Sequence, residues 1–192
     1  MNDNNITLPR YYNEIKQTSE AIAFSMLSDL QTGSLLRTLV HSKPSGKFLE
    51  LGTGTGLSLT WIAEAADQDS EIYSIENNGE FQKVAQQYFS NDKRISLICD
   101  DANEWIKNNQ DKKFDLIFAD AWPGKYETLD ETLNLLKVGG IYMIDDMLHQ
   151  PNWPEGHEDN VTALITKLEA MPSLSLTKMN WSTGIIIVTK NK

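Results

Sequence analysis

Residues 48–58 read Phe-Leu-Glu-Leu-Gly-Thr-Gly-Thr-Gly-Leu-Ser, and this stretch is the most informative one about the fold. An apolar, β-prone run ends in three alternate glycines, Gly52, Gly54 and Gly56, and an amphipathic stretch follows them. Because glycine has no Cβ, the backbone can turn tightly here and approach a ligand closely. A strand, a glycine-rich turn and a helix in this order predict an α/β fold with a ligand site at the turn.

The segments around this turn alternate between short β-prone runs and amphipathic stretches. Strands are expected at residues 47–51, 72–75, 95–99, 114–119 and 141–144. Helices are expected between them and beyond, at residues 57–66, 80–89, 102–108, 126–137 and 160–170. This alternation predicts parallel strands joined by right-handed helical crossovers, that is, a doubly wound sheet.

The last two β-prone runs break that alternation. Residues 174–178 and 184–189 are separated by a segment too short for a helical crossover, so they are expected to pair as an antiparallel hairpin at one side of the sheet. The sequence therefore predicts an α/β fold with a mostly parallel, seven-stranded, Rossmann-like sheet and a C-terminal antiparallel hairpin.

The N-terminal part of the chain has a helical period. Apolar residues between positions 11 and 40 recur at roughly helical spacing, interrupted near Gly33, which predicts two helices. We expect one compact domain overall, made of an N-terminal helical cap, residues 1–40, and the main α/β domain, residues 41–192.

Composition narrows the class of protein and of partner. The chain has 192 residues, 40% of them hydrophobic, and 17 Lys and Arg against 27 Asp and Glu, for a net charge of −10. This apolar content predicts a packed globule, and the acidity argues against binding to nucleic acid or to anionic membranes. A single cysteine, Cys99, excludes an intrachain disulfide, and its apolar surroundings predict a buried thiol. With neither a basic, apolar leader nor a long apolar run, a cytoplasmic location is expected.

The second strand is followed by an acid that suits a nucleoside. Glu76 lies 20 residues beyond Gly56, and its carboxylate can accept hydrogen bonds from both hydroxyls of a ribose. A dinucleotide-binding turn would also need glycine at position 57, where this sequence has Leu57. A nicotinamide-dependent oxidoreductase is therefore the less favoured alternative.

The motif E-x-G-x-G-x-G at residues 50–56, the acid after the second strand, and Asp101-Ala102 after the third resemble the class I S-adenosylmethionine-dependent methyltransferases. The resemblance covers about residues 30–189 and implies that S-adenosylmethionine (SAM) is the cofactor, held by the domain of residues 41–192. It also implies that the glycine turn holds the methionine part, Glu76 the ribose and Asp101 the adenine. The cofactor-binding residues that it implies are Glu50, Gly52, Thr53, Gly54, Gly56, Ser58, Glu76, Asn77, Asp101, Ala102 and Asp120.

Two further stretches resemble the catechol and caffeoyl-coenzyme A type O-methyltransferases. Residues 114–126 contain F-D-x-x-F-x-D with Lys and Tyr close behind, and residues 139–146 read G-G-x-x-x-x-D-D. The resemblance implies that Asp120, Asp145 and Asp146 hold a divalent cation such as Mg²⁺, which orients a substrate hydroxyl and lowers its pKa. Three carboxylates at adjacent strand ends also suit a hard cation on chemical grounds.

Two departures from that pattern leave metal dependence open. Position 146 is Asp where those enzymes have Asn, and Pro123 replaces a Lys three residues after Asp120. Lys125 is displaced from that position and is a candidate base only by reaching back. The alternative is a metal-free site in which Asp120 and Asp146 serve as base and substrate-positioning acids.

Residues 146–157 predict a lid over the acceptor pocket, because they combine two prolines, a glycine and apolar side chains. His149 is a candidate metal ligand or general base, and His157 is expected to be an ordinary hydrogen-bonded loop residue. Trp122 and Trp153 flank the predicted site, where a planar acceptor could stack. The candidate catalytic residues are Asp120, Lys125 and His149.

These observations together predict a SAM-dependent O-methyltransferase that acts on the hydroxyl of a small molecule, with a divalent metal as a candidate second cofactor. The alternatives are a metal-independent methyltransferase of another small acceptor and a non-catalytic SAM-binding module. The expected partner is the small-molecule acceptor, without nucleic acid or membrane. The two N-terminal helices and the C-terminal hairpin are candidate surfaces for a homodimer.

Overall fold

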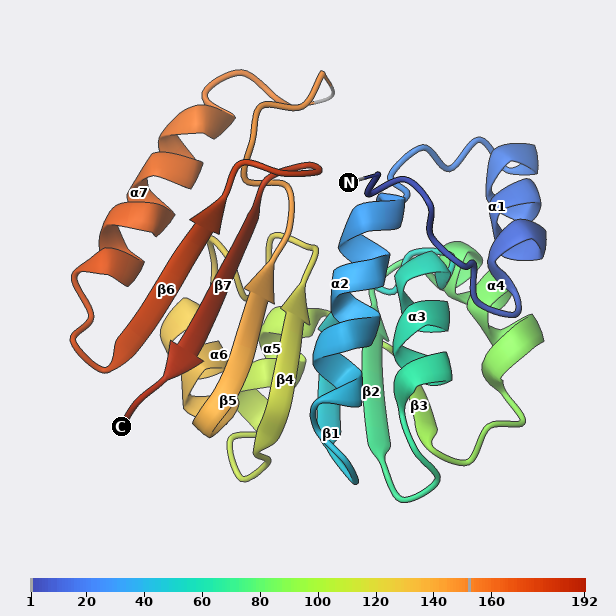
Figure 1. Ribbon diagram of the computed structural model, residues 1–192, viewed down its shortest axis with the longest axis horizontal. Helices are drawn as coiled ribbons and strands as arrows, with labels where there is room; N and C mark the ends of the chain where they lie inside the picture. The colour runs from blue at the N-terminus through green and yellow to red at the C-terminus, as the bar shows by residue number, and fades with distance from the viewer. Residues whose placement is uncertain (1, 152) are drawn as a thin grey trace.

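The computed structural model describes residues 2–151 and 153–192, which form a seven-stranded sheet in the order β3-β2-β1-β4-β5-β7-β6 (Figure 1). The strands are β1 (Lys47–Leu51), β2 (Glu71–Glu76), β3 (Ile95–Cys99), β4 (Phe114–Ala119), β5 (Leu136–Ile144), β6 (Leu174–Met179) and β7 (Ile185–Lys190). Strands β1 to β5 pair in parallel, whereas β7 runs antiparallel to β5 and β6. The predicted doubly wound sheet with an antiparallel hairpin at one edge is confirmed.

Helices pack against both faces of the sheet and form two hydrophobic cores. One face carries α1 (Tyr12–Ala21), α2 (Leu30–His41), α3 (Leu57–Ala65) and α4 (Gly79–Phe89), and the other carries α5 (Ala102–Asn108), α6 (Leu129–Leu135) and α7 (His157–Glu169). Strand β1 contributes Phe48 to the first core and Leu49 and Leu51 to the second. Burial on both faces explains why apolar residues of this strand point to either side of the sheet. Across residues 2–151 and 153–192, no helix combines the length and apolar character needed to cross a membrane.

The two predicted N-terminal helices are present, but the break between them lies elsewhere than expected. Helix α1 ends at Ala21 and α2 begins at Leu30, whereas Gly33 lies inside α2. A Cβ on Gly33 would overlap the Trp61 side chain, so the glycine allows α2 to pack closely on α3. Gly33 therefore reflects close packing of two helices and does not mark a helix end.

Two other local expectations are wrong. Cys99 is exposed, because it lies at the end of β3, the edge strand of the sheet, where the faces are only partly covered. The helix expected over residues 126–137 is limited to α6, because β5 already begins at Leu136. Both errors arise because apolar runs do not indicate which strand lies at an edge or where a helix gives way to a strand.

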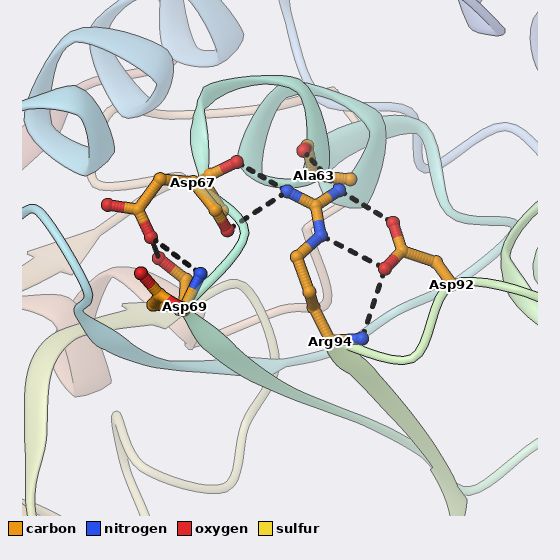
Figure 2. Close-up of polar contacts among 7 residues, drawn as sticks. Ala63, Asp67, Asp69, Asp92 and Arg94 are labelled. Atoms are coloured by element: carbon orange, nitrogen blue, oxygen red, sulfur yellow. Dashed lines mark hydrogen bonds and ion pairs between the residues drawn. The ribbon is translucent and has the colours of Figure 1, made fainter.

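Arg94 connects the end of α3 to the start of β3 (Figure 2). Its guanidinium donates to the backbone carbonyl of Ala63 over 3.0 Å and to that of Asp67 over 3.3 Å, and it forms an ion pair with Asp92 at 2.6 Å. A cation at a helix C-terminus satisfies carbonyls that lack helical partners and interacts favourably with the helix dipole. Arg94 thereby fixes the helix that follows the glycine turn.

Candidate active site

A cavity of about 920 Å³ opens where the carboxyl ends of β1, β2, β4 and β5 meet. Its wall includes the glycine turn after β1, Glu76 on β2, Asp120 after β4, and Asp145 and Asp146 after β5. Parallel strands bring their carboxyl ends to one edge of a sheet, which is where such folds bind ligands. The structure thus gathers into one cavity the strand ends on which the sequence analysis placed the site.

The glycine turn needs glycine for two physical reasons. Gly52 and Gly54 have φ angles of +99° and +52°, in the left-handed region that other residues rarely adopt. A Cβ on Gly52 would lie 2.7 Å from the backbone oxygen of Asp120, and one on Gly54 would lie 2.8 Å from the Phe24 ring. The absence of side chains therefore keeps this wall of the cavity open while the neighbouring segments approach it.

Glu76 fastens the glycine turn to the end of β2. Its Oε2 accepts a hydrogen bond from the backbone N–H of Gly54 over 2.7 Å, and its Oε1 accepts one from Asn78 over 2.9 Å. Glu76 and Asn77 both line the cavity. Each carboxylate oxygen can accept a second hydrogen bond. The residue therefore fits the predicted role of holding the two hydroxyls of a ribose.

Glu50, in contrast, lies beneath the turn and does not belong to the cavity wall. It is fully buried, and its carboxylate accepts hydrogen bonds from the hydroxyls of Ser58, at 2.6 Å, and Ser74. Burial raises the pKa of Glu50 to about 7 despite these hydrogen bonds. Ser58 and Thr53 do line the cavity. Glu50 thus ties the start of α3 to β2 and supports the turn from below.

Asp101 follows β3, and its carboxylate both faces the cavity and caps a helix. Asp101 lines the cavity, and its Oδ1 also caps α5 by accepting hydrogen bonds from the backbone N–H groups of Asn103, at 2.7 Å, and Glu104, at 3.3 Å. Two other predicted cofactor residues, Gly56 and Ala102, are buried outside the cavity wall. Asp101 therefore faces the cavity, whereas Gly56 and Ala102 do not.

Asp120, Asp145 and Asp146 lie together at the far end of the cavity from Glu76, after β4 and β5. Burial is the largest cause of a raised pKa in each, and it raises the pKa of Asp145 to about 6. The charge of a neighbouring aspartate raises these pKa values further, whereas Lys125 lowers them. The three carboxyl groups are thus close enough to influence one another.

The same three residues are not arranged as a set of metal ligands. Oδ1 of Asp145 accepts hydrogen bonds from the backbone N–H of Asp146, at 2.9 Å, and from the Thr32 and Thr183 hydroxyls. Oδ2 of Asp120 accepts one from Ser28 at 3.2 Å. Within residues 2–151 and 153–192, no three His, Cys, Asp or Glu side chains are grouped so that they could hold a metal ion. The ligand set implied by the resemblance does not fit a divalent ion in this arrangement.

Lys125 supplies a positive charge inside this acidic cluster. Its side chain is only 5% exposed, and Nζ donates to the backbone carbonyl of Asp145 over 2.8 Å and lies 4.0 Å from Oδ1 of Asp120. The tight turn that positions it begins at Trp122, whose carbonyl accepts the backbone N–H groups of Lys125 and Tyr126. The lysine that sequence analysis considered displaced is therefore at the site.

Aromatic side chains form the wall next to this cluster. Trp122, Tyr126, Trp153 and His157 all line the cavity, and the His157 ring lies 5.3, 5.0 and 4.6 Å from the rings of Trp122, Tyr126 and Trp153 respectively. Nε2 of His157 lies within hydrogen-bond distance of the Tyr126 hydroxyl, at 3.2 Å. Trp153, which belongs to the stretch predicted as a lid, thus lies in the cavity wall.

The positions of His149 and His157 are the reverse of those predicted. His149 has an exposed side chain that pairs with Glu158 at 3.1 Å, outside the cavity wall, whereas His157 is buried and lines the cavity. Phe24 and Phe81 also line the cavity, although they were not predicted from the sequence. Their rings pack 4.6 Å apart at the glycine turn. Nothing local in the sequence marks Phe24, because it reaches the turn only through the path of the segment between α1 and α2.

Comparison with known proteins assigns the family. A family profile described as O-methyltransferase matches residues 5–190. The chain belongs to the O-methyltransferase family. The curated relatives share this name: a "Putative O-methyltransferase" of Mycolicibacterium vanbaalenii is 31% identical over 117 residues, which are 58% of this chain and 52% of that protein. The chain thus spans about half the length of the curated relatives it matches.

Solved structures of O-methyltransferases share the fold over nearly the whole chain. The O-methyltransferase TomG of Streptomyces achromogenes, in complex with SAM, has a TM-score of 0.85 at 18% identity, and the comparison covers 98% of this chain and 93% of that one. An O-methyltransferase of Bacillus cereus, in complex with SAH, has a TM-score of 0.83 at 19% identity and covers 98% and 94% respectively. At these identities the likeness shows the fold alone.

Proposed function

We propose that this member of the O-methyltransferase family transfers the methyl group of SAM to a hydroxyl oxygen of a small, planar molecule. The observation that supports it most directly is that the Glu76-anchored glycine turn shares one cavity with Asp120 and Lys125. One part of the cavity thus suits a nucleoside, and the adjoining part carries acidic, basic and aromatic side chains. This continuity also favours catalysis over a module that only binds SAM.

On the donor side, the chain offers space and hydrogen-bond acceptors. Gly52 and Gly54 leave room for the methionine part, and Glu76 has free acceptor capacity for the ribose hydroxyls. Asp101 lies where the adenine would be expected, at the end of β3. The relatives solved with SAM or SAH have the same fold, which supports SAM as the donor.

On the acceptor side, the aromatic wall favours a flat molecule, because planar groups stack on Trp and Tyr rings. SAM supplies a methyl group already activated on a sulfonium. In the proposed reaction, Asp120 accepts the proton of the acceptor hydroxyl while the hydroxyl oxygen of the acceptor bonds to the methyl carbon. The bond between sulfur and the methyl carbon breaks, and its electron pair stays on sulfur. The chain thus contributes mainly proximity and proton removal.

The proposal is tested by offering the purified protein SAM that carries a radiolabelled methyl group, with a panel of phenols and catechols. Label is expected in a methyl ether of the acceptor. Asp120→Asn should abolish transfer while calorimetry still shows SAM binding. Asp130→Asn is the matched control, because Asp130 forms only an exposed ion pair with Lys167. Methylation confined to amines or thiols, or a wild-type protein that binds no SAM, would contradict the proposal.

A further inference from the structure

We propose that the ammonium group of Lys125 is the resident cation of the acceptor site, which positions the acceptor oxygen and leaves the carboxylate cluster closed to divalent ions. The inference deepens the proposed function and depends on it for its turnover experiment alone. The metal ligands implied by the sequence resemblance do not agree with the observed arrangement of Asp120, Asp145 and Asp146.

The position of Lys125 is fixed by the protein. The side chain is nearly buried, and Nζ donates a hydrogen bond to the backbone carbonyl of Asp145 over 2.8 Å. Because this carbonyl belongs to the backbone, rotation of the Asp145 side chain does not break the bond. Within residues 2–151 and 153–192, Nζ makes no second hydrogen bond with the protein. Two of the three N–H groups of Nζ can therefore face the cavity that Lys125 lines. A fixed ammonium with free donors can hold an acceptor oxygen as a metal ion would.

The same position is unfavourable for a divalent ion. A Mg²⁺ ion bound to Oδ1 of Asp120 at about 2.1 Å would lie no more than about 6 Å from Nζ, which is itself 4.0 Å from that oxygen. Two cations so close in a nearly buried site repel each other strongly. Asp145 adds to the effect, because its Oδ1 is already occupied by the Asp146 N–H and two threonine hydroxyls.

The charge of the cluster is consistent with this role. Lys125 acts electrostatically on Asp120, Asp145, Asp146 and His157, so its charge reaches all three carboxyl groups of the cluster. Removal of the ammonium would leave three carboxyl groups with no cation between them. Without the ammonium, Asp120 and Asp146 would be free to turn their carboxyl groups toward a hard, oxygen-preferring ion such as Mn²⁺.

The test is a titration with Mn²⁺, followed by electron paramagnetic resonance, on the full chain saturated with SAH. The wild type and Lys125→Arg are expected to bind no Mn²⁺ at this site at millimolar concentration. Lys125→Met, which keeps most of the apolar stem and loses the charge, is expected to bind Mn²⁺ at least tenfold more tightly than the wild type. Lys113→Met is the matched control, because Lys113 is exposed and donates to the Asn134 carbonyl, away from the cavity; it should behave as the wild type.

The turnover experiment uses the same variants. EDTA is expected to leave wild-type methyl transfer unchanged, and Lys125→Met to lower kcat at least tenfold without a change in SAM affinity, with partial recovery in Lys125→Arg. Submillimolar Mn²⁺ binding by the wild type that is lost in Asp145→Asn would overturn the proposal, even if Lys125→Met fails to fold. A folded Lys125→Met that gains no Mn²⁺ would also overturn it. Failure of the wild type to transfer a methyl group would contradict only the proposed function, because the Mn²⁺ titration needs no turnover.

Discussion

Oε2 of Glu76 accepts a hydrogen bond from the backbone N–H of Gly54 over 2.7 Å. The acid at the end of β2 therefore holds the turn that follows β1, and the two parts of the predicted nucleoside site depend on each other. A carboxylate in this position both shapes the cavity and faces it, so substitutions at Glu76 affect ligand binding through two routes.

Glu76→Ala is expected to weaken SAM binding roughly 100-fold or more, because hydrogen bonds to a charged group contribute about 1.5–3 kcal/mol each. Isothermal titration calorimetry measures the effect directly. Glu80→Ala is the matched control, since Glu80 is exposed on α4 and pairs only with Lys83. Unchanged affinity in Glu76→Ala would refute the assignment of this residue to the ribose.

Gly52→Ala tests whether the glycine turn is needed for space as well as for backbone conformation. The left-handed φ of +99° and the approach of the Asp120 backbone oxygen to 2.7 Å should together lower the free energy of unfolding by about 3 kcal/mol or more. In Gly139→Ala the φ is +78° but no atom lies within 4 Å of the new Cβ, so a loss of about 1–2 kcal/mol is expected. Urea denaturation compares the two, and equal losses would show that the contact with Asp120 is unimportant.

The raised pKa of Glu50 predicts that the stability of the protein depends on pH. Its pKa is about 7 in the folded protein, against 4.5 for the ordinary carboxyl group, so the folded state binds the proton more tightly. This contribution to stability is fully present below pH 4.5 and is lost as the pH rises through about 7, with an upper limit of roughly 3 kcal/mol. Glu50→Gln cannot titrate, so the wild type should lose stability relative to this variant between pH 5 and pH 8, as chemical denaturation measures. Parallel curves for the two proteins would contradict the raised pKa.

Arg94→Met is expected to lower the free energy of unfolding by about 1–3 kcal/mol, because three backbone carbonyls near the end of α3 and the Asp92 carboxylate lose a charged partner (Figure 2). Lys93→Met at the exposed neighbouring position provides the control and should change stability little. Because Arg94 lies at the opposite end of α3 from the glycine turn, SAM affinity is expected to stay the same below the melting temperature. A loss of affinity in the folded variant would show that α3 transmits its anchoring to the site.

Elements whose signals are local could be predicted from the amino-acid sequence. Alternating strands and helices, the glycine turn at Gly52 and Gly54, and a hairpin forced by the short connection between β6 and β7 all follow from periodicity and backbone chemistry. The acids after β2, β4 and β5 could also be placed at one edge, because parallel strands present their carboxyl ends together.

The use of the side chains at that edge depends on packing between distant segments. The tertiary structure buries Lys125 among carboxylates, turns Asp145 toward threonines from α2 and from the loop before β7, and places His157 inside the cavity and His149 outside it. It also brings Phe24 onto Gly54 across 30 residues of chain. These features depend on burial, rotamer and contacts between distant segments. None of them leaves a periodic or compositional trace in the sequence, because each is fixed by packing between elements and not by the residues next to it in the chain.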